Sequence, residues 1–90
     1  GSWEEHAKDC MSFMIRAGLW RGVKDTWGLE PEGTPAELLE KVGRRLGKLM
    51  SGGVVDTENA GLAFMEAFAT GKFGRMSLEK PGDPPLWEKL

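Results

Sequence analysis

The sequence predicts an all-α protein, a small compact bundle of three to five helices. Apolar residues recur at helical spacing in several stretches, residues that start and stop helices frame those stretches, and no stretch sustains the alternation of a strand. The clearest helix lies at residues 56–70, because Asp56 is suited to capping its N-terminus and Gly71 to ending it. Its buried stripe consists of Ala60, Ala63, Phe64, Ala67 and Phe68. We expect this helix to be central, with the others packed around it.

Two helical segments are expected near the N-terminus. The first covers residues 3–17, and the second is a short helix or helical turn at residues 19–27 that ends at Gly28. The apolar stripe of the first segment is Trp3, Ala7, Cys10, Met11 and Met14. In the second segment, Trp20, Val23 and Trp27 recur at helical spacing, so we expect them in the core rather than at a ligand site.

The third helix has the strongest start signal and is expected to run from Thr34 to about Leu49. Thr34 can act as the N-cap, Pro35 suits the first turn, and Glu37 completes a capping box. The expected buried residues are Leu38, Leu39, Val42, Leu46 and Leu49. Gly43 and Gly47 weaken this helix by about 1 kcal/mol each relative to alanine, and we interpret both as positions of close helix packing.

Length and composition indicate one small soluble domain. The chain has 90 residues, of which 40% are apolar and 29% charged, and its single cysteine excludes an internal disulfide. No run approaches the ~18 apolar residues of a membrane-spanning helix, so no membrane partner is expected. The net charge of −2 argues against nonspecific nucleic-acid binding by the whole surface, but it allows a local basic patch.

Three parts can be distinguished along the chain. Residues 1–2 resemble a cloning scar, residues 3–79 form a single helical domain, and residues 80–90 are a proline-rich tail. Trp87 in this tail is the aromatic residue that we most expect to be exposed, and it is a weak candidate for a partner contact.

Basic residues form a candidate nucleic-acid site in two segments. Four cations recur at helical spacing on the third helix, and a second group combines cations with glycines and an aromatic residue. The members are Lys41, Arg44, Arg45 and Lys48, followed by Gly71, Lys72, Phe73, Gly74 and Arg75. Cations neutralise phosphates, glycines let the backbone approach a phosphate, and the Phe73 ring is suited to stacking on an unpaired base. The alternative is a solvated helix face followed by a glycine-capped turn.

The sequence gives little support for nucleotide binding, metal binding or catalysis. No G-x-x-x-x-G-K-[ST] phosphate loop is present, and Gly71-Lys72 follows a helix and precedes Phe73 instead of a hydroxyl residue. His6 and Cys10 share one face of the first helix, but two ligands make a poor metal site. We therefore expect neither a catalytic site nor a bound metal in this chain.

The pattern GG-x-x-D-x-x-x-A…F-x-x-G-K-x-G-R-x-x-LE resembles the C-terminal end of the RbgA/YlqF family of ribosome-assembly GTPases. The matching residues are Gly52, Gly53, Asp56, Ala60, Phe68, Gly71, Lys72, Gly74, Arg75, Leu78 and Glu79. In that family a circularly permuted GTPase domain precedes a small helical domain that is similar to ANTAR-type RNA-binding domains. The family usually has Arg-Ser where this chain has Ala69-Thr70, so one cation of the family pattern is missing.

This resemblance implies a binding function. A domain of this family is expected to bind ribosomal RNA or the assembling large ribosomal subunit, and thereby to position the GTPase domain of the same parent chain. GTP and magnesium would belong to that GTPase domain, so no cofactor is expected here. The expected compartment is the bacterial cytoplasm, the mitochondrial matrix or the plastid stroma. The alternative is a helical protein–protein interaction module without RNA binding, which is also consistent with the acidic net charge.

Overall fold

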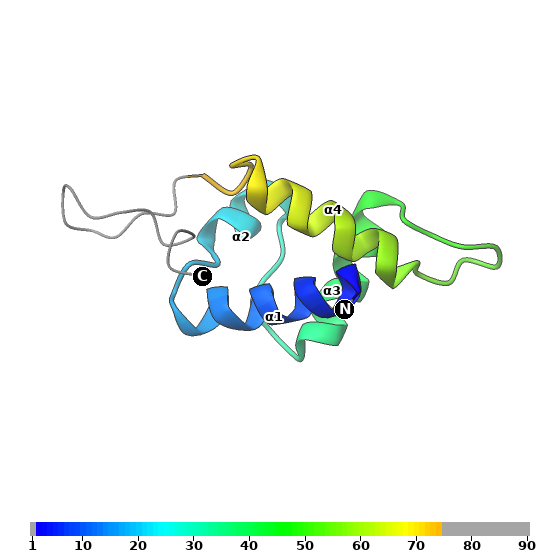
Figure 1. The fold of residues 1–90 in the computed structure, drawn as a ribbon, viewed down its shortest axis with the longest axis horizontal. Helices are drawn as coiled ribbons and strands as arrows, with labels where there is room; N and C mark the ends of the chain where they lie inside the picture. The colour runs from blue at the N-terminus through cyan, green and yellow to red at the C-terminus, as the bar shows by residue number, and fades with distance from the viewer. Residues whose placement is uncertain (1, 75–90) are drawn as a thin grey trace.

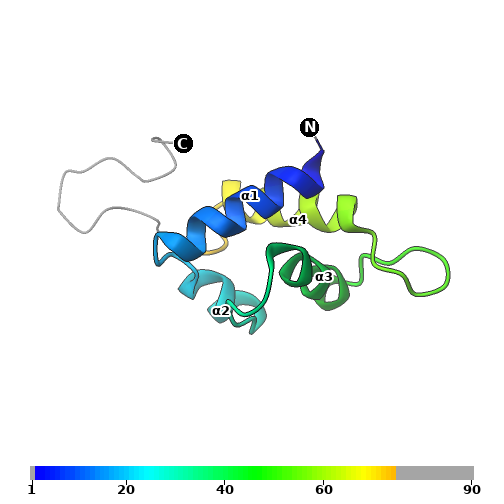
Figure 2. The ribbon, with the colours of Figure 1, turned by 90° about the horizontal axis from the view of Figure 1, so that it is seen from below.

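A computed structural model describes residues 2–74 as a bundle of four helices, which confirms the predicted all-α fold. The helices are α1 (Trp3–Arg16), α2 (Arg21–Trp27), α3 (Pro35–Leu46) and α4 (Thr57–Ala69). α1 and α4 run in the same direction and pack along each other, and α3 packs against both (Figures 1 and 2). The predicted boundary at residue 79 and the tail at residues 80–90 lie outside the described residues.

The helix starts agree with the predicted caps. The Thr34 hydroxyl accepts a hydrogen bond from Glu37 N at 3.1 Å, and the Glu37 carboxylate accepts one from Thr34 N at 3.3 Å, which completes the capping box. Asp56 caps α4 by accepting from Asn59 N at 3.0 Å. Ser2, assigned from the sequence to a cloning scar, caps α1 through its hydroxyl.

α3 is shorter than the sequence predicted. It ends at Leu46, because Gly47 adopts a left-handed conformation with φ 71° and Lys48 N then donates to Gly43 O at 2.8 Å. The prediction that the helix continues to Leu49 is therefore wrong. Leu49 was also expected to be buried, and its side chain is 47% exposed.

Hydrogen bonds connect the first turns of α1 and α4. The carboxylate of Glu58, in the first turn of α4, accepts from Trp3 N at 2.7 Å and from Glu4 N at 3.2 Å. The Thr57 hydroxyl donates to the Glu4 carboxylate at 3.0 Å. These bonds satisfy N–H groups that the first turn of a helix leaves unpaired, so α4 completes the start of α1.

An aromatic cluster around Phe64 forms one end of the core. The Phe64 ring lies 6.4 Å from Trp20, 6.2 Å from Trp27 and 5.2 Å from Phe73 between ring centroids. Phe73, beyond the end of α4, therefore folds back onto α2. Trp3, which was included in the apolar stripe of the first helix, is 46% exposed instead and packs beside His6.

Three helical glycines lie where backbones or side chains meet closely. A Cβ on Gly43 would overlap the side chain of Val55, so the predicted close packing at Gly43 is confirmed, whereas Gly47 ends the helix. A Cβ on Gly61 would lie 2.5 Å from the carbonyl oxygen of Trp3. A Cβ on Gly22 would overlap the backbone of Phe73.

A narrow loop, which we call the hairpin, connects α3 to α4 and projects from the bundle (Figure 1). It runs from Lys48 to Asp56 and is closed by hydrogen bonds from Met50 N to Val54 O at 2.7 Å and from Asp56 N to Lys48 O at 2.8 Å. Leu49 and Val55 form an isolated antiparallel bridge within it. No helix in the described part of the chain is long and apolar enough to cross a membrane.

Candidate nucleic-acid interface

The turn after α4 presents its backbone but not its aromatic ring. Gly71 and Gly74 have φ angles of 80° and 85°, and nothing lies within 4 Å of a Cβ built on either residue. Both are exposed, so a ligand can approach this backbone. Phe73 is only 5% exposed, and its ring packs edge-on against Trp27. The expectation that Phe73 stacks on an unpaired base is therefore wrong, because the ring anchors the turn to the core.

The predicted basic stripe is divided by the end of α3. Lys41, Arg44 and Arg45 are exposed on the helix, whereas Lys48 lies beyond it, at the start of the hairpin. Arg44 forms an ion pair with Glu40 at 3.3 Å, which offsets part of its charge. The other predicted cation, Arg75, lies outside the described residues.

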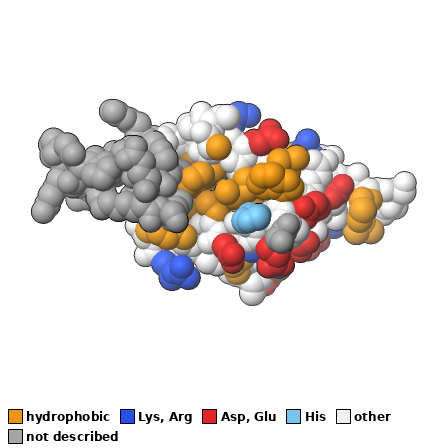
Figure 3. All heavy atoms as spheres, in the orientation of Figure 1, with side chains coloured by type: hydrophobic (Ala, Val, Ile, Leu, Met, Phe, Trp, Pro, Cys, Tyr) orange, Lys and Arg blue, Asp and Glu red, His pale blue; other side chains and the backbone are white. Residues whose placement is uncertain are grey.

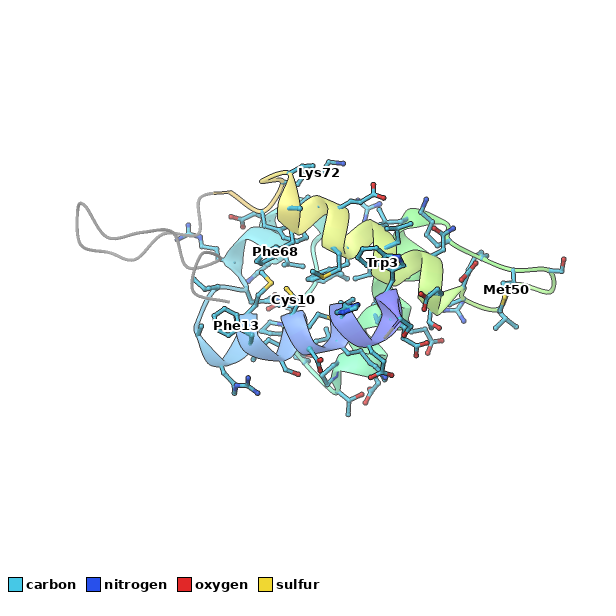
Figure 4. The ribbon with its side chains drawn as sticks, in the orientation of Figure 1. Trp3, Cys10, Phe13, Met50, Phe68 and Lys72 are labelled. Atoms are coloured by element: carbon cyan, nitrogen blue, oxygen red, sulfur yellow. The ribbon has the colours of Figure 1, made fainter. Side chains whose placement is uncertain are left out.

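Lys48 and Lys72 line one open groove, although they come from different elements and lie toward opposite ends of α4. The groove has a volume of about 380 Å³ and lies where the ends of α2 and α3 approach the C-terminal half of α4. We call it the lysine groove, and its lining residues are Trp27, Leu46, Lys48, Ala63, Glu66, Ala67, Thr70 and Lys72. Figure 4 shows Lys72 at the end of α4 that is remote from the hairpin. The structure thus brings together one cation from each predicted basic segment.

The charge balance of the groove is positive. Lys48 and Lys72 are opposed by the single carboxylate of Glu66 among the lining residues, so one positive charge remains in excess. Within residues 2–74, neither lysine lies within ion-pair distance of a carboxylate. Their ammonium groups are therefore available to an anion, and four apolar residues, Trp27, Leu46, Ala63 and Ala67, line the same groove.

Main-chain hydrogen bonds hold both lysines in place. The Thr26 hydroxyl on α2 donates to Lys72 O at 3.0 Å, which ties the turn after α4 to α2. Asp56 N, at the start of α4, donates to Lys48 O. The backbones of the two lysines are thus attached to neighbouring helices.

Comparison with known proteins does not identify a family. No family model matches the sequence, and no solved structure matches this fold at a significant level.

Of the groove's lining residues, sequence reasoning assigned only Lys48 and Lys72 to a site, and Trp27 and Glu66 are the most informative of those it missed. Trp27 was expected in the core, but it is only half-buried: one part packs against Phe64 and Phe73, and the side chain also lines the groove. The only available signal was its position at a helix end, directly before Gly28. Glu66 gave no signal, because an exposed glutamate on a helix is ordinary.

Elsewhere the described residues contain no cluster typical of a metal site. Among residues 2–74 there is no group of three or more histidine, cysteine, aspartate or glutamate side chains that could hold a metal ion. Burial raises the pKa of the Cys10 thiol to about 11, so this thiol is protonated at neutral pH and is a weak nucleophile.

The face shown in Figure 3 is mainly apolar and acidic, in contrast to the lysine groove. Apolar side chains there form a patch beside His6, acidic side chains gather near it, and lysine and arginine lie toward the edge. The acidic side chains on this face disfavour contact with an anion.

Proposed function

We propose that this domain binds ribosomal RNA and serves as the accessory domain of a GTPase in assembly of the large ribosomal subunit. The presence of both Lys48 and Lys72 in the lining of one groove is the observation that carries the RNA-binding part. The resemblance of residues 52–79 to the RbgA/YlqF pattern supports the ribosomal part.

The physical argument concerns local charge. The chain is acidic overall, with a net charge of −2, so attraction to RNA depends on where its cations gather. Two lysines at the groove neutralise phosphates and release counterions, and the exposed Lys41 and Arg45 extend the basic surface along α3. The open backbone at Gly71 and Gly74 lets a phosphate approach the turn that carries Lys72.

In this proposal the domain determines where its parent protein is placed. RNA binding holds the parent on the assembling particle, while the GTPase domain binds GTP and magnesium and times arrival and release. The proposed compartment is the bacterial cytoplasm or, for an organellar protein, the mitochondrial matrix or plastid stroma.

The test is fluorescence anisotropy with large-subunit rRNA fragments at several salt concentrations. We expect log affinity to fall linearly with log salt, and we expect Lys48→Ala and Lys72→Ala each to reduce that slope by about 1. Lys8→Ala is the matched control, because Lys8 lies on α1 and pairs with Glu5 at 3.1 Å. Slopes that stay unchanged in both groove variants would contradict RNA binding at the groove.

A protein-interaction module is the second candidate function. The hairpin favours it, because Leu49, Met50 and Val54 are exposed apolar residues and Met50 projects from the bundle (Figure 4). Met50→Ser/Val54→Ser would abolish a protein contact made there and leave RNA affinity unchanged. Lys48→Glu/Lys72→Glu would do the reverse. Pull-downs and anisotropy with both variants therefore separate the two functions.

A further inference from the structure

The lysine groove contains a feature that phosphate binding alone does not explain, the carboxylate of Glu66. A carboxylate repels phosphate, yet Glu66 on α4 lines the same groove as Lys48 and Lys72. The Thr70 hydroxyl bonds to the main-chain oxygen of Glu66 at 2.7 Å, not to its carboxylate. In the described part of the chain, no ion pair involves this carboxylate. It is therefore free to accept hydrogen bonds from a ligand.

We propose that the groove holds one unpaired guanine nucleotide of the RNA, with its flanking phosphates at Lys48 and Lys72 and its base edge at Glu66. This inference rests on the proposed RNA-binding function and adds a preference for one base. An ionised carboxylate only accepts hydrogen bonds. Guanine presents two adjacent donors, N1–H and the N2 amino group, on its Watson–Crick edge, so it can bond to both carboxylate oxygens. Uracil presents one donor between two carbonyl acceptors, which a carboxylate repels.

The size and lining of the groove suit a single base. Its volume of about 380 Å³ falls within the range of about 300–1,000 Å³ found for ligand pockets. Leu46, Ala63 and Ala67 supply apolar contacts, and Trp27 supplies an aromatic side chain of the kind on which bases stack. In a duplex the Watson–Crick edge is occupied by the paired base, so only a bulged or single-stranded guanine can reach Glu66.

The experiment compares hairpin RNAs that differ at one bulged position. Guanine, adenine, cytosine or uracil occupies the bulge, a fully paired hairpin completes the series, and anisotropy measures affinity at one salt concentration. For the unmodified domain we expect the guanine bulge to bind about tenfold more tightly than the uracil bulge or the paired hairpin, as for one good base-edge contact.

Glu66→Gln supplies the decisive variant, because it keeps the shape of the side chain and removes its charge. We expect the guanine preference to disappear while affinity for the paired hairpin stays equal or rises, since one repulsive charge is lost. Glu32→Gln is the matched control, because Glu32 is exposed in the loop before α3 and outside the groove lining. It should leave the preference intact.

Guanosine monophosphate, titrated separately, distinguishes an RNA nucleotide from a free one. Tight binding of this mononucleotide without any preference among the RNA bulges would overturn the assignment to RNA. Equal affinity for all four bulges, or a guanine preference that survives Glu66→Gln, would overturn the inference and leave RNA binding at the groove intact. Loss of all RNA binding would overturn both.

Discussion

Among residues 2–74, Cys10 is the residue whose pKa is shifted most by the fold. It lies on α1, packs against the core and has a pKa raised by burial from 9.0 to about 11. The folded state therefore holds the thiol proton more tightly than the unfolded chain does. By linkage, the stabilisation is fully present below pH 9 and is lost as the pH rises from about 9 to about 11.

We expect urea denaturation to show this loss when measured at pH 8 and at pH 10.5. Cys10→Ala is the control, because it removes the thiol while other groups still titrate. The difference in unfolding free energy between the two pH values should be larger for the unmodified domain than for Cys10→Ala. Equal differences in the two proteins would contradict the assigned shift.

For Phe73 and Trp27, the local sequence did not predict the surroundings of the side chain. Phe73 stands between two glycines and beside cations, which is a pattern typical of an exposed turn, yet its ring is buried. The reason is tertiary: the turn after α4 folds back over Gly22, where only a hydrogen leaves room for the Phe73 backbone. Trp27 became a groove residue for the same reason, because the buried Phe73 ring occupies one side of the indole.

At the scale of secondary-structure elements, local capping residues could be predicted from the sequence, whereas a cap supplied by another helix could not. Thr34 and Asp56 act within a few residues of themselves, so sequence spacing is sufficient to identify them as caps. Glu58 caps the start of α1 from α4, across 55 residues of sequence, and no local pattern indicates such a contact. The end of α3 is encoded at Gly47, which takes the left-handed conformation typical of a helix end, although we had interpreted this glycine as a packing position.

At Gly61, where α1 and α4 cross, helix propensity and steric overlap have opposite effects on the stability of an alanine variant. Helix propensity alone favours Gly61→Ala by about 1 kcal/mol. The added methyl would lie 2.5 Å from Trp3 O and 2.8 Å from Glu4 N, and neither backbone atom can move without separating the helices. We therefore expect a net destabilisation of about 1–3 kcal/mol, measured by urea denaturation.

Ala69→Gly calibrates the propensity term, because Ala69 is an exposed residue of the same helix. It should cost no more than about 1 kcal/mol. A stabilised Gly61→Ala variant would mean that the two helices are not in contact at this position.

At the scale of the whole molecule, the aromatic cluster links the core to the groove. Phe64 is fully buried and packs against the rings of Trp20, Trp27 and Phe73. Trp20 directly precedes α2, Trp27 ends it, and Phe73 follows α4. The sequence predicted a buried Phe64 from helical periodicity. It also identified Lys48 and Lys72 as candidate binding residues, but not that both line one groove, because that depends on how α3 and α4 pack.

Phe64→Leu should therefore affect more than local packing. We expect a loss of about 1–3 kcal/mol in unfolding free energy, together with a weakened near-ultraviolet circular dichroism signal from the tryptophans that it releases. Phe68→Leu is the matched control on the same helix, where the ring is only half-buried, and it should cost less. Equal losses in the two variants would contradict the central position of Phe64.

The hairpin has a consequence for how this domain can vary. Its base is closed by the hydrogen bond from Asp56 N to Lys48 O, and its tip at residues 51–53 is exposed. Changes in the length of the tip therefore do not reach Lys48 or the cap of α4. Insertions are tolerated best at such exposed tips. An insertion at this tip, or a fluorescent label attached there, should therefore leave the groove undisturbed.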